Sequence, residues 1–171
     1  MESAAVSSLV LPAEYPWILL ACVILCIECF LMGLFFVAPA RGMMNAEFME
    51  QFKEEHQEVF PGGMPATGGF PDCGEGRYAE KLSYPDWIKF NNAMRVHQNF
   101  VEQLPMVLTF LMFSGLILPK TTMIVGFVYA TSRPVYSYMY AKQGGDKRYI
   151  GALCGSLPLY GLALTTFIMA I

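Results

Sequence analysis

The chain has few charged residues and only two histidines. Charged side chains make up 15% of its 171 residues, against about 25% in a typical soluble domain. His56 and His97 lie far apart in the sequence without ligand-spaced partners, so the sequence predicts no metal site. A net charge of −3 gives no indication of nucleic-acid binding.

The five cysteines also lack a functional pattern. Three of them lie in one apolar run, where thiols pack as small hydrophobic side chains. The sequence therefore predicts neither a disulfide framework nor a zinc site. The segment MESAAVSSLVLPAEYPW has no basic region before its apolar stretch, which is atypical of cleaved signal and transit peptides. We expect the first membrane helix itself to direct insertion.

Hydrophobic residues are abundant, at 55% of the chain, and they are grouped in long runs. A membrane-spanning helix needs about 20 mostly apolar residues. Four segments fit or nearly fit this length: 15–38, 88–118, 121–140 and 150–171. Because the last three are joined by short connections, we expect an all-α membrane protein with an antiparallel bundle of four transmembrane helices. Residues 1–171 would form a single domain, with no repeat of 20–50 residues.

Basic residues are distributed unevenly between the two ends of this predicted bundle. Only Lys120 lies at the end that carries the 118–120 turn. The opposite end carries Arg41, Lys53, Arg77, Lys81, Lys89, Arg95, Lys142, Lys147 and Arg148. The positive-inside rule therefore predicts that the loops 41–90 and 141–149 face the cytosol or its organellar equivalent.

The loop 41–86 divides into two parts by composition. NAEFMEQFKEEHQEVF (45–60) is charged and helix-prone, whereas PGGMPATGGFPDCGEGRY (61–78) is rich in Gly and Pro and should lack regular structure. A loop of this length is usually functional or covers another part of the molecule.

Polar residues follow helical spacing in the second predicted span. Arg95, Asn99 and Glu102 occupy positions i, i+4 and i+7, which share one helix face. Ionisable groups are expensive at the edge of a bilayer and usually mark a functional site. This face offers a cation, an amide and a carboxylate, which would suit a zwitterionic ligand.

The third predicted span carries a matching stripe of Tyr129, Arg133, Tyr136 and Tyr140. Two interpretations remain open for these polar faces. The first is internal neutralisation, in which Arg133 pairs with Glu28 or Glu102, Arg95 extends to the interface and the tyrosines form an aromatic belt. The second is a polar ligand held between helices. Pro134 removes one backbone donor within this span, so it would shape either a pocket or a packing bend.

The segments FNNAMRVHQNFVEQLP (90–105) and SRPVYSYMYAKQGGDKRYIGALCGSLP (132–158) closely resemble the MAPEG family, the membrane-associated proteins in eicosanoid and glutathione metabolism. AEYPWILL (13–20) and the AR at 40–41 resemble the branch of type 3 microsomal glutathione S-transferases. The likeness covers residues 13–41 and 87–171.

This resemblance implies a homotrimer that binds glutathione between subunits as a co-substrate, near the cytosolic side. By position, the resemblance assigns glutathione contacts to Arg41, Arg95, His97, Asn99, Glu102, Arg133, Tyr136 and Tyr140. Lys147, or Arg148, falls where the leukotriene-synthase branch has the arginine that activates the thiol. A cation lowers a thiol pKa, and the Tyr136 hydroxyl could donate a hydrogen bond to the sulfur.

Some residues depart from the family pattern. Gly42 follows Arg41 where the leukotriene-synthase branch has a second arginine, which argues against that activity. Gln103 follows Glu102 where that branch often has tyrosine, and the loop 41–86 is about twice the length that we expect for the type 3 branch.

Two functions follow from these observations. The first is a glutathione-dependent membrane transferase or peroxidase whose lipophilic substrate, an electrophile or lipid hydroperoxide, arrives from the bilayer. The second is a structural or accessory subunit of a larger membrane complex with little or no catalysis. We expect the endoplasmic reticulum membrane, with a mitochondrial or other organelle membrane as the alternative.

Overall fold

The computed structural model describes residues 10–147 and 149–171, with the backbone alone at Lys147 and Ile150. All regular structure in these residues is helical, which confirms the all-α class. The elements in chain order are α1 (Tyr15–Met32), η1 (Gly33–Val37), α2 (Ala38–Arg41), α3 (Ala46–Glu50), α4 (Lys53–Val59), η2 (Ala79–Lys81), α5 (Tyr84–Ile117), α6 (Pro119–Gln143), η3 (Gly145–Lys147) and α7 (Tyr149–Ala170).

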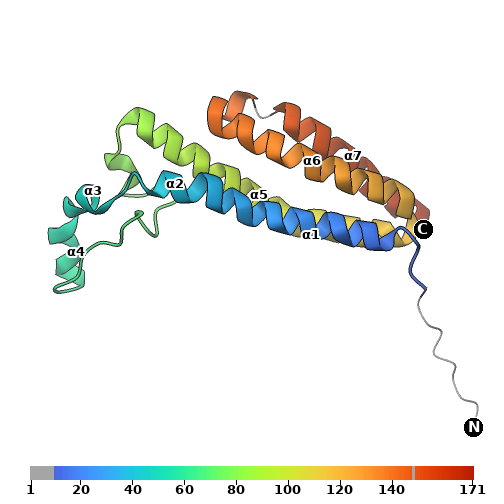
Figure 1. The fold of residues 1–171 in the computed structure, drawn as a ribbon, viewed down its shortest axis with the longest axis horizontal. Helices are drawn as coiled ribbons and strands as arrows, with labels where there is room; N and C mark the ends of the chain where they lie inside the picture. Colours follow the sequence, from blue (N-terminus) through green and yellow to red (C-terminus); the bar gives the residue numbers. More distant parts are fainter. Residues whose placement is uncertain (1–9, 148) are drawn as a thin grey trace, which may run out of the picture.

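The long helices α1, α5, α6 and α7 lie alongside one another (Figure 1). Helix α1 continues through the π-helical turn η1 into α2 and contacts α5 and α6, while α7 packs on α6 and α5. Leu118 alone separates α5 from α6, so these helices are antiparallel neighbours. This turn and the C-terminus lie at one end of the bundle, and the other two connections lie toward the opposite end (Figure 1).

Local sequence signals account for the helix boundaries. The Ser83 hydroxyl accepts a hydrogen bond from the Asp86 backbone N–H at 3.4 Å and caps the start of α5. Pro119 occupies the first turn of α6, where its missing N–H has no cost. Gly144 ends α6 with a φ of +78°, a conformation that favours glycine. Helix α6 also runs without interruption through Pro134.

The bundle has a buried apolar core and an apolar outer surface. Ile18 and Leu25 from α1, Phe100 and Leu111 from α5, and Leu159 from α7 are almost fully buried in one cluster. The outward faces expose further large hydrophobic side chains, among them Val23, Ile27, Phe30, Phe113, Leu157, Leu164 and Phe167. A helix that is apolar all round suits a lipid environment.

Three helical segments of the described chain are long and apolar enough to cross a bilayer: Tyr15–Arg41, Tyr84–Ile117 and Gly151–Ala170. They correspond to the first, second and fourth predicted spans. The third, 121–140, forms helix α6, but it is too polar to qualify by composition. Several of its polar side chains, including Thr122, Ser132, Arg133 and Ser137, are buried within the bundle. The crossing of the bilayer by α6 therefore stays a prediction.

Helices α6 and α7 approach each other closely at glycines. A Cβ atom added at Gly151 would lie 2.7 Å from the Cα of Tyr136. Small residues allow two helix backbones to come this close in membrane proteins. Gly151 therefore sets the distance between α7 and the tyrosine stripe of α6.

Residues 42–83, which we call the loop lobe, fold beyond the end of the bundle (Figure 1). Asn45 caps α3 by accepting from the Phe48 N–H at 2.9 Å. The helix-prone stretch 45–60 forms two short helices rather than one. The lobe and the first turns of α5 share a second apolar core that includes Met44, Met49, Phe52, Ala79, Phe90 and Met94.

Asp72 orders the Gly- and Pro-rich part of the lobe. Its buried carboxylate accepts hydrogen bonds from the backbone N–H groups of Gly74 at 2.7 Å, Gly76 at 3.0 Å and Ala79 at 2.7 Å. The indole N–H of Trp87 in α5 donates to the Gly74 carbonyl at 3.0 Å. This segment lacks helix before η2, as expected, but it has a defined path fixed by side-chain hydrogen bonds.

Candidate functional site

The polar faces of α5 and α6 meet in the structure. The side-chain amide of Asn99 donates a hydrogen bond to the hydroxyl oxygen of Tyr136 at 3.2 Å. Asn99 is half-buried and Tyr136 is buried. The ring of Tyr140 lies 5.9 Å from that of Tyr136 and is also buried. The helical spacing of the two stripes therefore brings them together within one subunit.

Gln103 connects the same two helices one turn further along α5. Its side-chain oxygen accepts from the Tyr129 hydroxyl at 2.9 Å and from Arg133 Nη1 at 3.2 Å. In the sequence, Gln103 stands out only as a departure from a family pattern. Its position four residues after Asn99 places it on the same face, and that spacing could have identified it.

Arg133 is buried in the bundle and only partly satisfied. Its guanidinium carbon lies 4.3 Å from the ring centroid of Phe100 and 4.7 Å from that of Tyr136, within cation–π range. Its Nε and Nη2 groups have no hydrogen-bond partner among the described residues. Arg133 forms an ion pair with neither Glu28 nor Glu102, so direct neutralisation is not found in this subunit.

The other two residues of the predicted α5 face have different partners. Arg95 forms an ion pair with Glu75 of the loop lobe. The carboxylate of Glu102 is exposed and accepts from the side-chain amide of Gln98 at 2.9 Å. Arg95, Asn99 and Glu102 thus share a helix face but interact with the lobe, with α6 and with α5 itself, respectively. Sequence reasoning missed Glu75, and no pattern connects it to α5.

The contacts that Arg41 and His97 make in the structure involve neither Asn99 nor Tyr136. Arg41 donates to the Gly68 carbonyl at 2.8 Å and stacks over the ring of Phe70 at 3.9 Å, so it anchors the loop lobe to the end of α2. His97 is half-buried beside η1, where a Cβ atom added at Gly33 would lie 3.6 Å from its Nε2.

The predicted thiol-activating cations lie at the connection between α6 and α7. The backbone of Lys147 ends the short helix η3, and its side chain lies outside what the structure describes. Arg148 lies outside the described residues. Within 10–147 and 149–171, no three His, Cys, Asp or Glu side chains are grouped as metal ligands.

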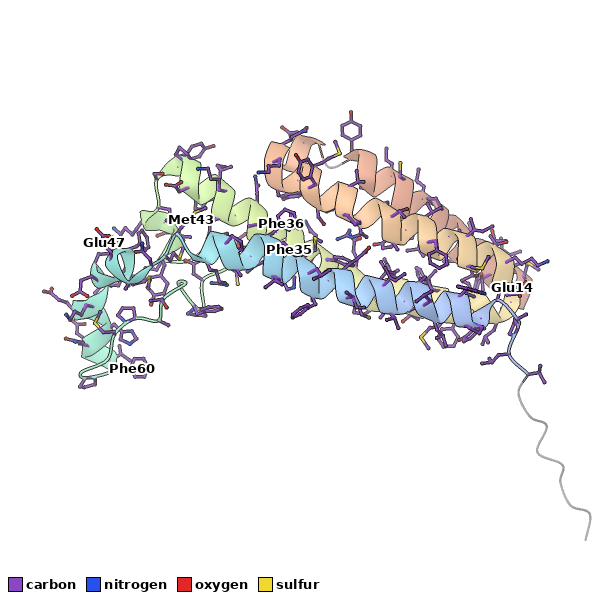
Figure 2. All side chains as sticks on the ribbon, in the orientation of Figure 1. Glu14, Phe35, Phe36, Met43, Glu47 and Phe60 are labelled. Carbon is purple, nitrogen blue, oxygen red and sulfur yellow. The ribbon has the colours of Figure 1, made fainter. Side chains whose placement is uncertain are left out.

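A cavity of about 600 Å³ lies between the loop lobe and α5, with Arg95 and Gln98 on its α5 side. Phe60 also lines it and lies at the tip of the lobe, far from Glu14 at the other end of α1 (Figure 2). Two regions with polar residues therefore lie along α5. Asn99 and Gln103 belong to the buried α5–α6 layer, and Arg95 and Gln98 line the open cavity.

The fold and the site define an integral membrane protein whose helical bundle encloses a layer of tyrosine, arginine and amide side chains. The family model of the MAPEG family matches residues 18–168, and the chain belongs to that family. The family includes glutathione transferases and peroxidase-type members. No solved structure matches the chain.

Proposed function

We propose that the protein is a glutathione-dependent membrane transferase or peroxidase that acts on lipophilic electrophiles or lipid hydroperoxides. The observation that carries this proposal is the Asn99–Tyr136 hydrogen bond, with Arg133 buried beside the Tyr136 ring. Polar groups buried in a membrane bundle are expensive, and such groups usually serve a function. Family membership supplies the expected co-substrate.

The charges of glutathione match the side chains on this face. The tripeptide has two carboxylates, one ammonium group and one thiol. Arg95 would bind a carboxylate, because guanidinium and carboxylate form paired hydrogen bonds. The exposed carboxylate of Glu102 would accept from the ammonium group. Tyr136 would donate to the sulfur, and Lys147 or Arg148 would stabilise the thiolate.

The thiolate would then react in one of two ways. In conjugation, sulfur forms a bond to an electrophilic carbon, and the electron pair goes to a leaving group or to an acceptor atom that is then protonated. In peroxide reduction, two glutathione molecules become one disulfide while the hydroperoxide becomes an alcohol and water. The lipophilic substrate would enter from the bilayer.

A neighbouring copy of the chain would complete the site. Two guanidinium nitrogens of Arg133 and one buried oxygen of Glu28 have no partner among the described residues of one subunit. A homotrimer, with His97 contributing across the interface, would place additional groups at this layer. We propose the endoplasmic reticulum membrane, with loops 41–90 and 141–149 on the cytosolic side.

Purified protein in nanodiscs tests the proposal directly. We expect glutathione binding, conjugation of a lipophilic electrophile such as 1-chloro-2,4-dinitrobenzene, and reduction of a lipid hydroperoxide. Asn99→Ala combined with Glu102→Ala should abolish both reactions, while Glu58→Gln in the loop lobe should leave them unchanged. Absence of glutathione binding and of both reactions in the unmodified protein would refute the enzyme proposal.

An accessory subunit is the second candidate, and the loop lobe favours it. The lobe has its own apolar core and still exposes large apolar side chains, including Val59, Phe60 and Met64. Exposed apolar residues outside a bilayer segment often mark a protein interface. Purification from native membranes with a defined heterologous complex, at one copy per complex and without catalysis, would support this candidate over the homotrimeric enzyme.

A further inference from the structure

The cavity between the loop lobe and α5 has the size and lining of a small-molecule site. Its volume of about 600 Å³ lies within the usual range for ligand pockets. One wall is apolar and comes from the lobe: Phe52, Val59, Phe60, Pro71 and Tyr78. Val59 and Phe60 are 69% and 60% exposed, so the lobe leaves much of this wall without contacts of its own.

The polar wall contains two ion pairs. Arg95 pairs with Glu75, and Arg77 pairs with Glu55 at 2.6 Å. All four side chains are substantially exposed, from 38% for Arg95 to 70% for Arg77. Exposed ion pairs contribute little to stability, so a competing charged ligand can replace one partner at small cost.

The two partners of the Arg95–Glu75 pair differ in how firmly they are held. Arg95 belongs to the continuous helix α5, whereas Glu75 lies in a segment without regular structure. The third acid of the cavity, Asp72, is already occupied by the backbone N–H groups that order the lobe. Displacement of Glu75 therefore leaves a cation on a continuous helix, available to another carboxylate.

We propose that this cavity binds an amphiphilic carboxylate, with its carboxylate on Arg95 in place of Glu75 and its apolar body against Val59 and Phe60. The aromatic pair of His56 and Phe60, with ring centroids 5.1 Å apart, provides a wall for a flat or extended apolar group. This site goes beyond the proposed function, because its occupant contacts the lobe and binds without glutathione. Since both ligands would place a carboxylate on Arg95, they would compete for that side chain.

The site is tested by measuring 2-naphthoate binding to the full chain in nanodiscs. Saturation-transfer NMR detects the binding, and no glutathione is present. We expect 2-naphthoate to bind, decanoate to displace it, and the uncharged 2-naphthamide and decanol to fail in both roles. Equal binding of the acid and the amide would overturn the assignment of a carboxylate ligand. Absence of acid binding would overturn the site itself, whatever the result with glutathione.

Matched variants locate the two ends of the ligand. Arg95→Gln should weaken 2-naphthoate binding about tenfold or more, because it removes a charge-assisted partner. Glu75→Gln should strengthen it by up to about fivefold, since it removes the competing carboxylate. Glu58→Gln removes the same charge from the lobe outside the cavity and should change nothing. An unchanged affinity in both Arg95→Gln and Glu75→Gln would refute the proposed anchor.

A second pair of variants tests the apolar wall. Phe60 and Met64 are both exposed in the lobe, but only Phe60 lines the cavity. We expect Phe60→Ala to weaken 2-naphthoate binding severalfold and Met64→Ala to leave it unchanged. Equal effects of the two variants would show that the acid does not occupy this cavity.

Discussion

Individual polar side chains join α5 to α6 inside a bundle that is otherwise apolar. Asn99 contacts Tyr136, and Gln103 receives hydrogen bonds from Tyr129 and Arg133. A buried polar group without a partner costs more free energy than a formed hydrogen bond contributes. Changes at these positions should therefore affect both stability and the proposed chemistry, and conservative variants can separate the two effects.

Removal of the Tyr136 hydroxyl tests its role toward the sulfur. Tyr136→Phe keeps the ring beside Arg133 and Tyr140 but removes the Asn99 partner. We expect kcat for conjugation to fall about 10²-fold, which is typical when one hydrogen-bond donor to the developing charge is removed. The free energy of unfolding should fall by about 1 kcal/mol. Steady-state kinetics and thermal unfolding measure both. Unfolding at lower temperature with unchanged kcat would assign the hydroxyl to packing alone.

Gln103 should be needed mainly to satisfy Arg133 and Tyr129. Gln103→Leu would leave two buried donors without their acceptor, and we expect a loss of about 3 kcal/mol in the free energy of unfolding. Gln103→Glu restores an acceptor and adds a charge opposite to that of Arg133, so it should be much less destabilising. Denaturation of both variants in the same detergent provides the comparison. Equal destabilisation would contradict the importance of this acceptor.

Two helices of the bundle depend on a glycine for their separation. Gly151 places α7 against the backbone of α6 at Tyr136, whereas Gly161 on the same helix has no atom within 4 Å of an added Cβ. The distance between α6 and α7 therefore depends on the size of the residue at position 151, but not on the size of the residue at position 161. Because Tyr136 belongs to the polar layer, a shift of α7 at this point should also disturb the site.

Alanine at each of these glycines tests that dependence. Gly151→Ala must move α7 or α6 and should lower the free energy of unfolding by about 1–3 kcal/mol. Gly161→Ala removes a flexible residue from an open helix position and should be neutral or stabilising by up to about 1 kcal/mol. Thermal unfolding in nanodiscs measures both. A similar response of the two variants would contradict the close packing at Gly151.

At the scale of the whole molecule, the long helices of the bundle differ in whether their composition alone suits a bilayer. Three helical segments of the described chain are apolar enough by composition, and α6 packs among them with Thr122, Ser132, Arg133 and Ser137 buried in the bundle. A helix whose polar groups are buried by neighbouring helices can cross a bilayer despite its composition, because lipid contacts only its apolar outer side.

Cysteine labelling determines whether α6 spans. Lys120 and Lys142 are exposed near opposite ends of α6. In a background where the five native cysteines are replaced, we expect Lys120→Cys and Lys142→Cys to react with a membrane-impermeant maleimide from opposite sides of sealed vesicles. Lys142→Cys should label from the side of the loop lobe, as the positive-inside rule predicts. Labelling of both from one side would show that α6 does not cross.

The sequence by itself determined the helical class and the residues that share each helix face. Long apolar runs can satisfy their backbone polar groups in a membrane only as helices or closed barrels, and helical spacing places Asn99 with Glu102 and Tyr136 with Tyr140. The first, second and fourth predicted segments correspond to helical segments apolar enough to span a bilayer, and the third forms α6, whose crossing stays a prediction. The Asn99–Tyr136 contact connects two faces that the sequence had identified separately.

Tertiary structure alone decided which partner each polar residue has. Arg95 pairs with Glu75, Arg41 with the Gly68 carbonyl, and Arg133 with Gln103 rather than with a carboxylate. Helical periodicity fixes a direction around one helix, but it carries no information about where a lobe of 42 residues with only short helices folds back. The position of the loop lobe depends on the shared apolar core and on the hydrogen bonds of Asp72, and both exist only once the chain is folded.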